Sequence, residues 1–343
     1  MMCIFKKHQQ GSVLILTLWT ITFLTIFAVN IGLRVRQRVT LIARIESRSH
    51  LHLMAQAGVK KAIAVLRRDL EQHAQIYTSL GKTNRHNNID DFKDIHVGRG
   101  TVNVSYLYGA PGSEKKETNY GFQDEERKIN INRADRKTLQ NLMLLTVARD
   151  EESAAVLAEA IIEWREFGLT QVEGFNSEGY YATLEYPYEI KDYEFEVIEE
   201  LMLVRGFTPQ VFEQLSPFIT IYGDGLVNIN TAPKTVLMAL GLRADVADKV
   251  LSVRNGVDEE EATKDDYIFY KTFDIASEMS IFVELKRDEI TQIDFLNASR
   301  RIKTNSDYYL IRSLAYTDPQ KPQKEVQCVY NSKDNLVVYW REK

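Results

Sequence analysis

The sequence predicts an α+β protein in which a long N-terminal helix packs on a small antiparallel sheet, with a large α-helical domain inserted between strands. Three observations predict this. Residues from Ser12 to Leu33 carry no ionisable side chain, and about 22 residues span roughly 33 Å as a helix, enough to cross a hydrocarbon core. Alternating strand patterns lie on both sides of residues 128–300. That middle segment carries 17 Lys and Arg against 32 Asp and Glu, whereas its flanks are basic.

Bulk composition places the chain among globular proteins. Its 343 residues are enough for two domains of ordinary size, with 44% hydrophobic and 27% charged residues. The two cysteines, Cys3 and Cys328, lie at opposite ends of the chain. They imply no disulfide framework and leave the redox compartment open.

A helical pattern continues beyond the apolar span. No proline occurs from Arg34 to about His73. We therefore expect the transmembrane helix of residues 12–33 to continue through residues 34–77. Its apolar positions recur at about 3.6 residues, and they are Leu41, Ile45, Leu51, Met54, Gly58, Ala62, Val65 and Leu70.

The first residues admit two interpretations. A secretory signal has a shorter apolar region followed by a small-residue cleavage site, and neither is present, so one interpretation is a plain signal anchor. The other is that residues 1–11 resemble the type IV prepilin leader, a short basic segment that ends in Gly11. That resemblance implies cleavage by a prepilin peptidase after Gly11 and N-methylation of Ser12, where the family usually has Phe or Met.

Leu16 occupies an informative position in this resemblance. The fifth residue after the cut is usually Glu in pilins, and here it is Leu16. A carboxylate inside a bilayer is costly and usually has a partner, which in pilins is the terminal amine of a neighbouring subunit. A subunit without this carboxylate would fit the end of a filament better than its repeating shaft.

The middle of the chain contains an internal repeat. Residues Lys128–Ala134 read Lys-Ile-Asn-Ile-Asn-Arg-Ala, and Leu226–Ala232 read Leu-Val-Asn-Ile-Asn-Thr-Ala. Similar helical patterns follow each copy and end in Trp164-Arg165 and Val253-Arg254. Each copy predicts a short strand, an Asn helix cap and two helices joined by a turn.

The second copy resembles a helix-hairpin-helix unit with its turn near Leu240–Ala244. Such units often bind DNA through the amides of a Gly-x-Gly turn, of which only Gly241 is present. The net charge of about −15 on residues 128–300 would repel phosphate. We therefore expect the hairpins to be structural and expect no nucleic-acid partner.

The pattern after residue 300 returns to strands. We expect strands at Tyr308–Ala315, Glu325–Tyr330 and Asn335–Trp340, with turns at Asp318-Pro319 and Asn331–Asp334. We expect a strand at Gly100–Leu107 to join them against the N-terminal helix, after a polar loop at residues 78–98. Residues 98–127 and 301–343 would then form the sheet, with residues 128–300 as the inserted helical domain.

The order of these features resembles the protein K family of the type II secretion system, the large minor pseudopilins. The matching stretches are Gly11–Trp19, Met54–Leu66, Val204–Pro209 and Val337–Glu342. The resemblance implies a pilin-like fold with an inserted helical domain, and a tip complex with minor pseudopilins I and J above the shaft of the major pseudopilin. It also implies a single-pass protein of the bacterial inner membrane, with its C-terminal bulk in the periplasm, that helps to initiate pseudopilus assembly and protein export.

Catalytic motifs are missing from the sequence. All six histidines lie at or before His96, and no nucleophile–base pair, Gly-rich phosphate loop or His-Glu-x-x-His motif occurs. We therefore expect a protein that is not an enzyme.

A calcium site is the one metal site that the sequence favours. Calcium needs several oxygen ligands at close range, and acidic residues crowd residues 163–192 among glycines. Relatives in the protein K family bind calcium after a Trp-containing helix, which here is Glu163-Trp164-Arg165-Glu166. The resemblance implies ligands among four glutamates, and a solvated acidic surface is the alternative reading; the four are Glu163, Glu166, Glu173 and Glu178.

The charges around the span oppose the expected orientation. Lys6 and Lys7 precede it, whereas Arg34, Arg36, Arg38 and Arg44 follow it. Under the positive-inside rule this difference alone would place the C-terminal bulk in the cytoplasm.

Two other functions remain open from the sequence. One is a minor pilin of a type IV pilus or of a DNA-uptake apparatus, which would share the leader and the long helix. The other is a membrane-anchored DNA-binding protein that uses the helix-hairpin-helix unit.

Overall fold

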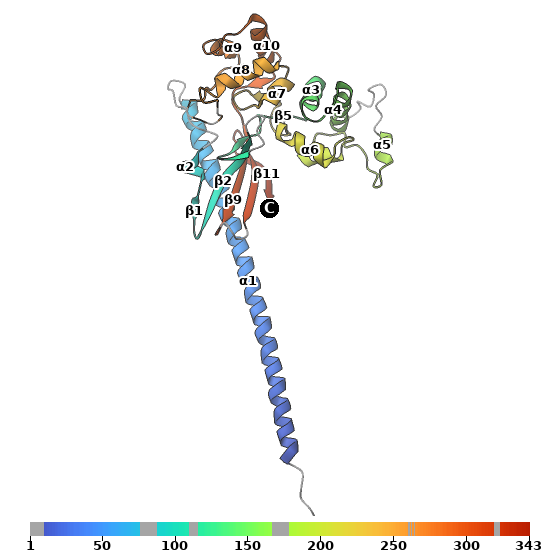
Figure 1. Ribbon diagram of the computed structural model, residues 1–343, viewed down its shortest axis with the longest axis vertical. Coiled ribbons are helices and arrows are strands. Elements are labelled where there is room, and N and C mark those ends of the chain that lie inside the picture. The colour runs from blue at the N-terminus through green and yellow to red at the C-terminus, as the bar shows by residue number, and fades with distance from the viewer. Residues whose placement is uncertain are drawn as a thin grey trace, which may run out of the picture.

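A single helix forms the stem of the molecule. The computed structural model describes residues 10–75, 88–109, 116–166, 178–259, 261, 263, 265–318 and 323–343. Helix α1 (Gln10–Gln75) has 66 residues, or about 100 Å of length, and carries all the other elements at its far end (Figure 1). Residues 13–50 of α1 are exposed, whereas one face is buried from Leu51 onward. The predicted continuation of the helix beyond the span is confirmed as far as Gln75.

The upper part of α1 lies on an antiparallel sheet. The sheet order is β1-β2-β9-β10-β11, with β3 paired to β2 and β4 paired to β9. The predicted pairing of the first strand with the C-terminal strands is confirmed, because Val102 of β2 lies opposite Ala315 of β9. The strands are β1 (Ile95–Val97), β2 (Gly100–Gly109), β3 (Lys116–Tyr120), β4 (Gln123–Asp124), β9 (Tyr308–Tyr316), β10 (Lys324–Asn331) and β11 (Leu336–Glu342).

Gly58 allows the helix to approach the sheet closely. A Cβ atom at this position would lie 2.2 Å from Ser313 Oγ and 2.5 Å from Val102 Cγ1. Both distances are far below van der Waals contact, so only a glycine fits without movement of β2 or β9. The apolar face around Gly58 is buried as the helical periodicity predicts, through Met54, Ala55 and Ala62.

The predicted loop at residues 78–98 is wrong for its described part. Helix α2 (Ile89–Phe92) and strand β1 occupy that part. The side chain of Asn88 accepts a hydrogen bond from Asp91 N and caps α2, and Phe92 is buried against α1 and the sheet. A polar sequence around a single phenylalanine gave no periodic signal for either element.

The remaining helices form the rest of the head, above and beside the sheet (Figure 1). Two short parallel pairs tie them together, β5 (Ile129–Asn130) with β6 (Ile219–Thr220) and β7 (Val227–Asn228) with β8 (Ile302–Lys303). The helices are α3 (Arg136–Thr146), α4 (Glu151–Arg165), α5 (Glu178–Ala182), η1 (Ile198–Leu203), α6 (Pro209–Leu215), η2 (Ser216–Phe218), α7 (Lys234–Ala239), α8 (Ala244–Arg254), α9 (Ile275–Met279) and α10 (Arg287–Ala298).

Two hydrophobic cores stabilise the head. One joins α1 to the sheet and includes Met54, Phe122 and Ile311. The other lies wholly within residues 129–302. The predicted α+β class, with a long N-terminal helix on an antiparallel sheet, is therefore confirmed. That residues 128–300 form an inserted domain stays a prediction.

Each copy of the internal repeat forms a strand followed by two helices, namely β5, α3 and α4, then β7, α7 and α8. The predicted Asn caps are wrong. Asp135 caps α3 by accepting from Thr138 N at 2.7 Å, and Pro233 precedes α7. Asn130 and Asn228 instead accept from the N–H two residues later and close a tight turn before the helix. The helix-hairpin-helix assignment stays a prediction.

Candidate functional site

The repeat is preserved at the level of side-chain contacts. The side-chain amide of Asn132 makes two hydrogen bonds to the backbone of Phe195. Its Oδ1 accepts from Phe195 N at 2.8 Å, and its Nδ2 donates to Phe195 O at 3.0 Å. Asn230 holds Phe269 in the same way, at 2.8 Å for both bonds. An amide that satisfies one distant residue twice fixes a loop without a strand pair. Both copies therefore attach a long loop at the same place.

An arginine completes each copy. The guanidinium of Arg165 donates to the carbonyl oxygens of Ile131 and Ala134, the latter at 2.9 Å. The guanidinium of Arg254 donates to the carbonyls of Ile229 and Ala232, the latter at 2.7 Å. These carbonyls lie in the turn before the first helix of each copy. The last residue of the second helix thus fixes the start of the first, which explains the repeated arginine as a structural residue.

The second copy is attached to the sheet through Asp124 of β4. This carboxylate is almost fully buried. It accepts hydrogen bonds from Asn228 at 2.9 Å, from Ser306 at 2.6 Å and from Thr231. Several charge-assisted hydrogen bonds of this kind offset the cost of burying a charge. Asp124 therefore joins the sheet to the turn of the second copy and, through Ser306, to the segment between β8 and β9.

Two more buried carboxylates follow Asp124 directly. Glu125 accepts from Lys128 Nζ at 2.6 Å and from Thr220 Oγ1 at 2.8 Å. Glu126 pairs with Lys303 Nζ and accepts from Asp307 N at 2.6 Å. Burial raises the pKa of Glu126, although the hydrogen bonds from Lys303 and Asp307 act in the opposite direction. We call Asp124, Glu125, Glu126 and Lys303 the junction cluster.

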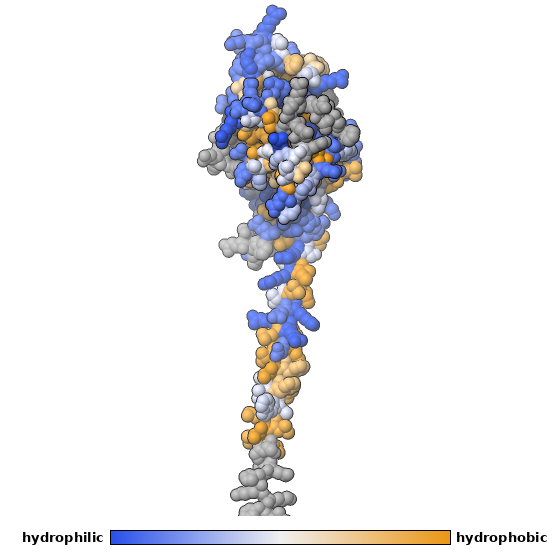
Figure 2. Space-filling view, turned by 90° about the vertical axis from the view of Figure 1, so that its right-hand side faces the viewer, coloured by the Kyte–Doolittle hydropathy of each residue, from blue (hydrophilic) through white to orange (hydrophobic). Residues whose placement is uncertain are grey.

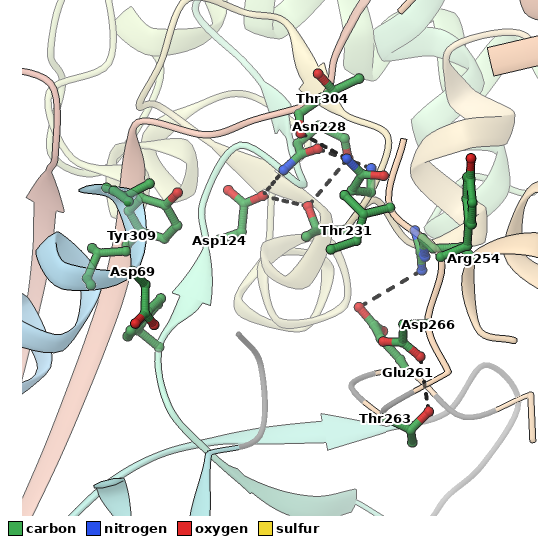
Figure 3. A pocket seen from close by; sticks show the side chains of 16 residues that line it. Asp69, Asp124, Asn228, Thr231, Arg254, Glu261, Thr263, Asp266, Thr304 and Tyr309 are labelled. Atoms are coloured by element: carbon green, nitrogen blue, oxygen red, sulfur yellow. Dashed lines mark hydrogen bonds and ion pairs between the residues drawn. The ribbon is translucent and has the colours of Figure 1, made fainter. Parts of the chain in front are cut away.

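A small cavity with polar and apolar lining residues lies beside the junction cluster, between α1, the sheet and the second copy (Figure 3). Its volume is about 60 Å³, room for a few water molecules. Asp69 faces it from α1 and Asp124 from β4, whereas Arg254 and Glu261 lie on the opposite side (Figure 3). Lining residues bond to one another, as Asp124 does to Asn228 and Arg254 to Glu261. The cavity therefore lies within the contact between the stem and the head.

The predicted calcium ligands are not brought together in the described part of the chain. Glu163 is buried on α4, and Glu166 follows α4 and pairs with Arg165 at 2.7 Å. Glu173 and the side chain of Glu178 lie outside the described residues. Among the described residues, no three His, Cys, Asp or Glu side chains gather in a way that could hold a metal ion. The calcium site stays a prediction.

The predicted processing residues lie at the start of α1. The helix begins at Gln10 and includes Gly11 and Ser12, whose side chains are not described. Leu16 is 65% exposed. Helix α1 is long and apolar enough to cross a membrane, and it is the only such helix among the residues searched, those the structure describes.

The threonine hydroxyls of the span bond within α1 itself. Thr22 and Thr25 donate to the carbonyls four residues earlier, each at 2.8 Å, and Thr17 and Thr20 donate to the carbonyls three residues earlier. Asn30 donates to Ile26 O at 3.0 Å. Hydrogen bonds to the helix's own backbone lower the cost of placing these groups in lipid.

Sequence reasoning missed the junction cluster. Three consecutive acidic residues followed by Arg and Lys look like a solvated turn. The partners that bury Asp124 and Glu126 lie about 100 to 180 residues away. The one available signal was position, because residues 124–128 stand at the predicted boundary between the sheet and the helical segment.

Comparison with known proteins finds one family match over part of the chain and one shared fold. Residues 101–224 match the family model described as "Type II secretion system (T2SS), protein K". A solved chain from "The Crystal Structure of the GspK-GspI-GspJ complex from enterotoxigenic Escherichia coli Type 2 Secretion System" has the same fold, with a TM-score of 0.59 and 13% identity over 88% of this chain and 98% of that one. No curated protein matches the chain. Over residues 101–224 the chain is therefore similar to the type II secretion system protein K family, and it shares the fold of the chain solved in the GspK-GspI-GspJ complex.

Proposed function

We propose that the protein is a minor pseudopilin at the tip of the type II secretion pseudopilus. The observation that carries the proposal is the position of the head, which caps the end of α1 opposite the membrane span (Figure 1). A filament of this kind grows by packing stems side by side. A subunit with a broad head above its stem would leave no room for another subunit above it.

Leu16 supports the same position. It places an apolar, exposed side chain at the site where pilins usually have the buried carboxylate. Without that carboxylate the subunit has no charge to pair with the terminal amine of a neighbour below it in the shaft. A subunit that needs no such partner can be the first to leave the membrane, and it would therefore help to initiate assembly.

The proposed partners are minor pseudopilins I and J, with the major pseudopilin forming the shaft below. Support comes from the family match and from the shared fold with a chain of a K–I–J complex. The protein would be anchored in the bacterial inner membrane by α1, with its head in the periplasm. Its role would be structural, with no catalytic step.

Labelling of assembled pseudopili tests the tip position. Gold particles directed at a tag on the head should lie at filament ends, whereas a tag on the major pseudopilin should label the whole shaft. Label distributed along the shaft would contradict the proposal.

Coexpression with a prepilin peptidase should also shorten the chain by residues 1–11, and an intact N-terminus would remove the prepilin interpretation.

A further inference from the structure

A group of arginines surrounds α1 directly after the membrane span. We define the arginine collar as Arg34, Arg36, Arg38 and Arg44. All four side chains are exposed, and no ion pair joins any of them to another described residue. No Asp or Glu occurs between Arg34 and Arg44. The functions described above for the head and the junction cluster do not involve these four positive charges.

The collar lies at the depth of the lipid headgroups. At 1.5 Å per residue, Arg34, Arg36 and Arg38 follow Leu33 within about 8 Å along the helix axis. The headgroup layer on each side of a bilayer is about 5–8 Å thick. Arg44 lies about 16 Å beyond Leu33, but its side chain leans toward the helix N-terminus and so toward the membrane. Figure 2 shows hydrophilic residues on the stem between its apolar segment and the head.

The four arginines point in different directions around the helix. With 100° per residue, Arg38 lies about 40° from Arg34, Arg36 about 200° and Arg44 about 280°. A single partner helix covers one face, whereas headgroups surround a membrane helix on all sides. The four positions span an arc of about 200°, wider than the face that one partner helix covers, and this spread fits lipid better than one protein partner.

We propose that the arginine collar binds the phosphate groups of anionic phospholipids around α1, in the leaflet that faces the head. Guanidinium groups pair with phosphate in a bidentate way. Attraction to an anionic surface amounts to about a fivefold gain in affinity per basic residue. The collar keeps the subunit seated until assembly lifts α1 out of the bilayer. The proposal depends on α1 crossing the membrane and not on the tip position.

The test uses the full chain reconstituted in nanodiscs that contain equal amounts of phosphatidylglycerol and phosphatidylcholine. After transfer to a mild detergent, mass spectrometry counts the lipids that stay bound. The wild type should retain phosphatidylglycerol at least about fivefold over phosphatidylcholine. Replacement of all four collar arginines by Gln should bring the ratio close to one, and replacement by Lys should preserve most of the preference.

A matched control removes four positive charges from exposed positions elsewhere, with Arg67, Lys137, Arg149 and Arg287 changed to Gln. This control should retain lipid as the wild type does. Equal retention by the wild type and the Gln collar variant would overturn the proposal. Wild-type protein that retains phosphatidylglycerol but binds neither protein I nor protein J would contradict the tip proposal alone.

Discussion

Lys303 donates a hydrogen bond to Glu126 across 177 positions of the sequence, at the point where the chain returns from the helical region to the sheet. Both side chains are buried, with 11% and 2% of their surfaces exposed. Gly223 makes room for the pair, because a Cβ there would lie 2.3 Å from Glu126 Oε1. An ion pair shielded from solvent therefore joins β8 to the segment that follows β4.

Removal of Lys303 should weaken the head. Lys303→Met keeps the apolar stem but leaves the Glu126 carboxylate buried without its cation, which costs about 3–5 kcal/mol of unfolding free energy. Thermal unfolding of the full chain in detergent should show a clear fall in melting temperature. Lys333→Met, at an exposed turn position, is the control and should change little. Equal melting of both variants would show that the ion pair does not stabilise the head.

The same carboxyl group predicts a pH dependence. Burial raises the folded pKa of Glu126 above its ordinary 4.5. The protonated Glu126 carboxyl therefore stabilises the folded state. This contribution is fully present below pH 4.5 and is lost as the pH rises through the folded pKa of Glu126. Relative to Glu126→Gln, the wild type should lose stability as the pH rises above the ordinary pKa of 4.5. Urea unfolding of both proteins at several pH values measures this difference, and a constant difference would refute the pKa assignment.

Gly58 should not tolerate a side chain. Alanine favours helix by about 1 kcal/mol over glycine, but its Cβ would overlap Ser313 and Val102, and overpacking costs about 1–3 kcal/mol. Gly58→Ala should therefore lower the melting temperature of the full chain. Gly32→Ala has nothing within 4 Å and serves as the control. Stabilisation by Gly58→Ala would mean that helix and sheet are less closely packed than described.

The sequence predicted the elements with strong periodicity. The stem repeats an apolar side chain every 3.6 residues, and β9 alternates buried and half-buried residues along its length, so both patterns were visible in the sequence. The pairing of Gly100–Gly109 with β9 followed from the alternation on both sides of the helical segment. The apolar periodicity of the local sequence was enough to predict a helix or strand wherever one face of that element is buried.

Features that depend on distant partners were not predictable. Asn130 and Asn228 read as helix caps, yet their turns orient Asn132 and Asn230 toward loops 63 and 39 residues away. Glu126 gave no signal in the sequence because its partner Lys303 lies 177 positions away. Phe92 is one buried residue in a polar stretch, and burial of a single side chain leaves no period.

The calcium prediction can be tested directly. If calcium binds the loop after α4, millimolar calcium should raise the melting temperature by mass action, because the ion binds only the folded protein. Glu178→Ala should reduce this shift, whereas Glu284→Ala, an exposed acidic residue elsewhere, should not. Magnesium at the same concentration is the ion control. An unchanged melting temperature of the wild type in calcium would reject the site.

Reconstitution with minor pseudopilins I and J tests the central claim most directly. The full chain, coexpressed with both proteins and purified through a tag on its C-terminus in mild detergent, should elute with I and J as one complex in a fixed ratio. Its mass should be measured by light scattering. We expect a complex with one copy of this chain, since the head excludes a second copy above it. Elution of the chain without either partner would contradict the account.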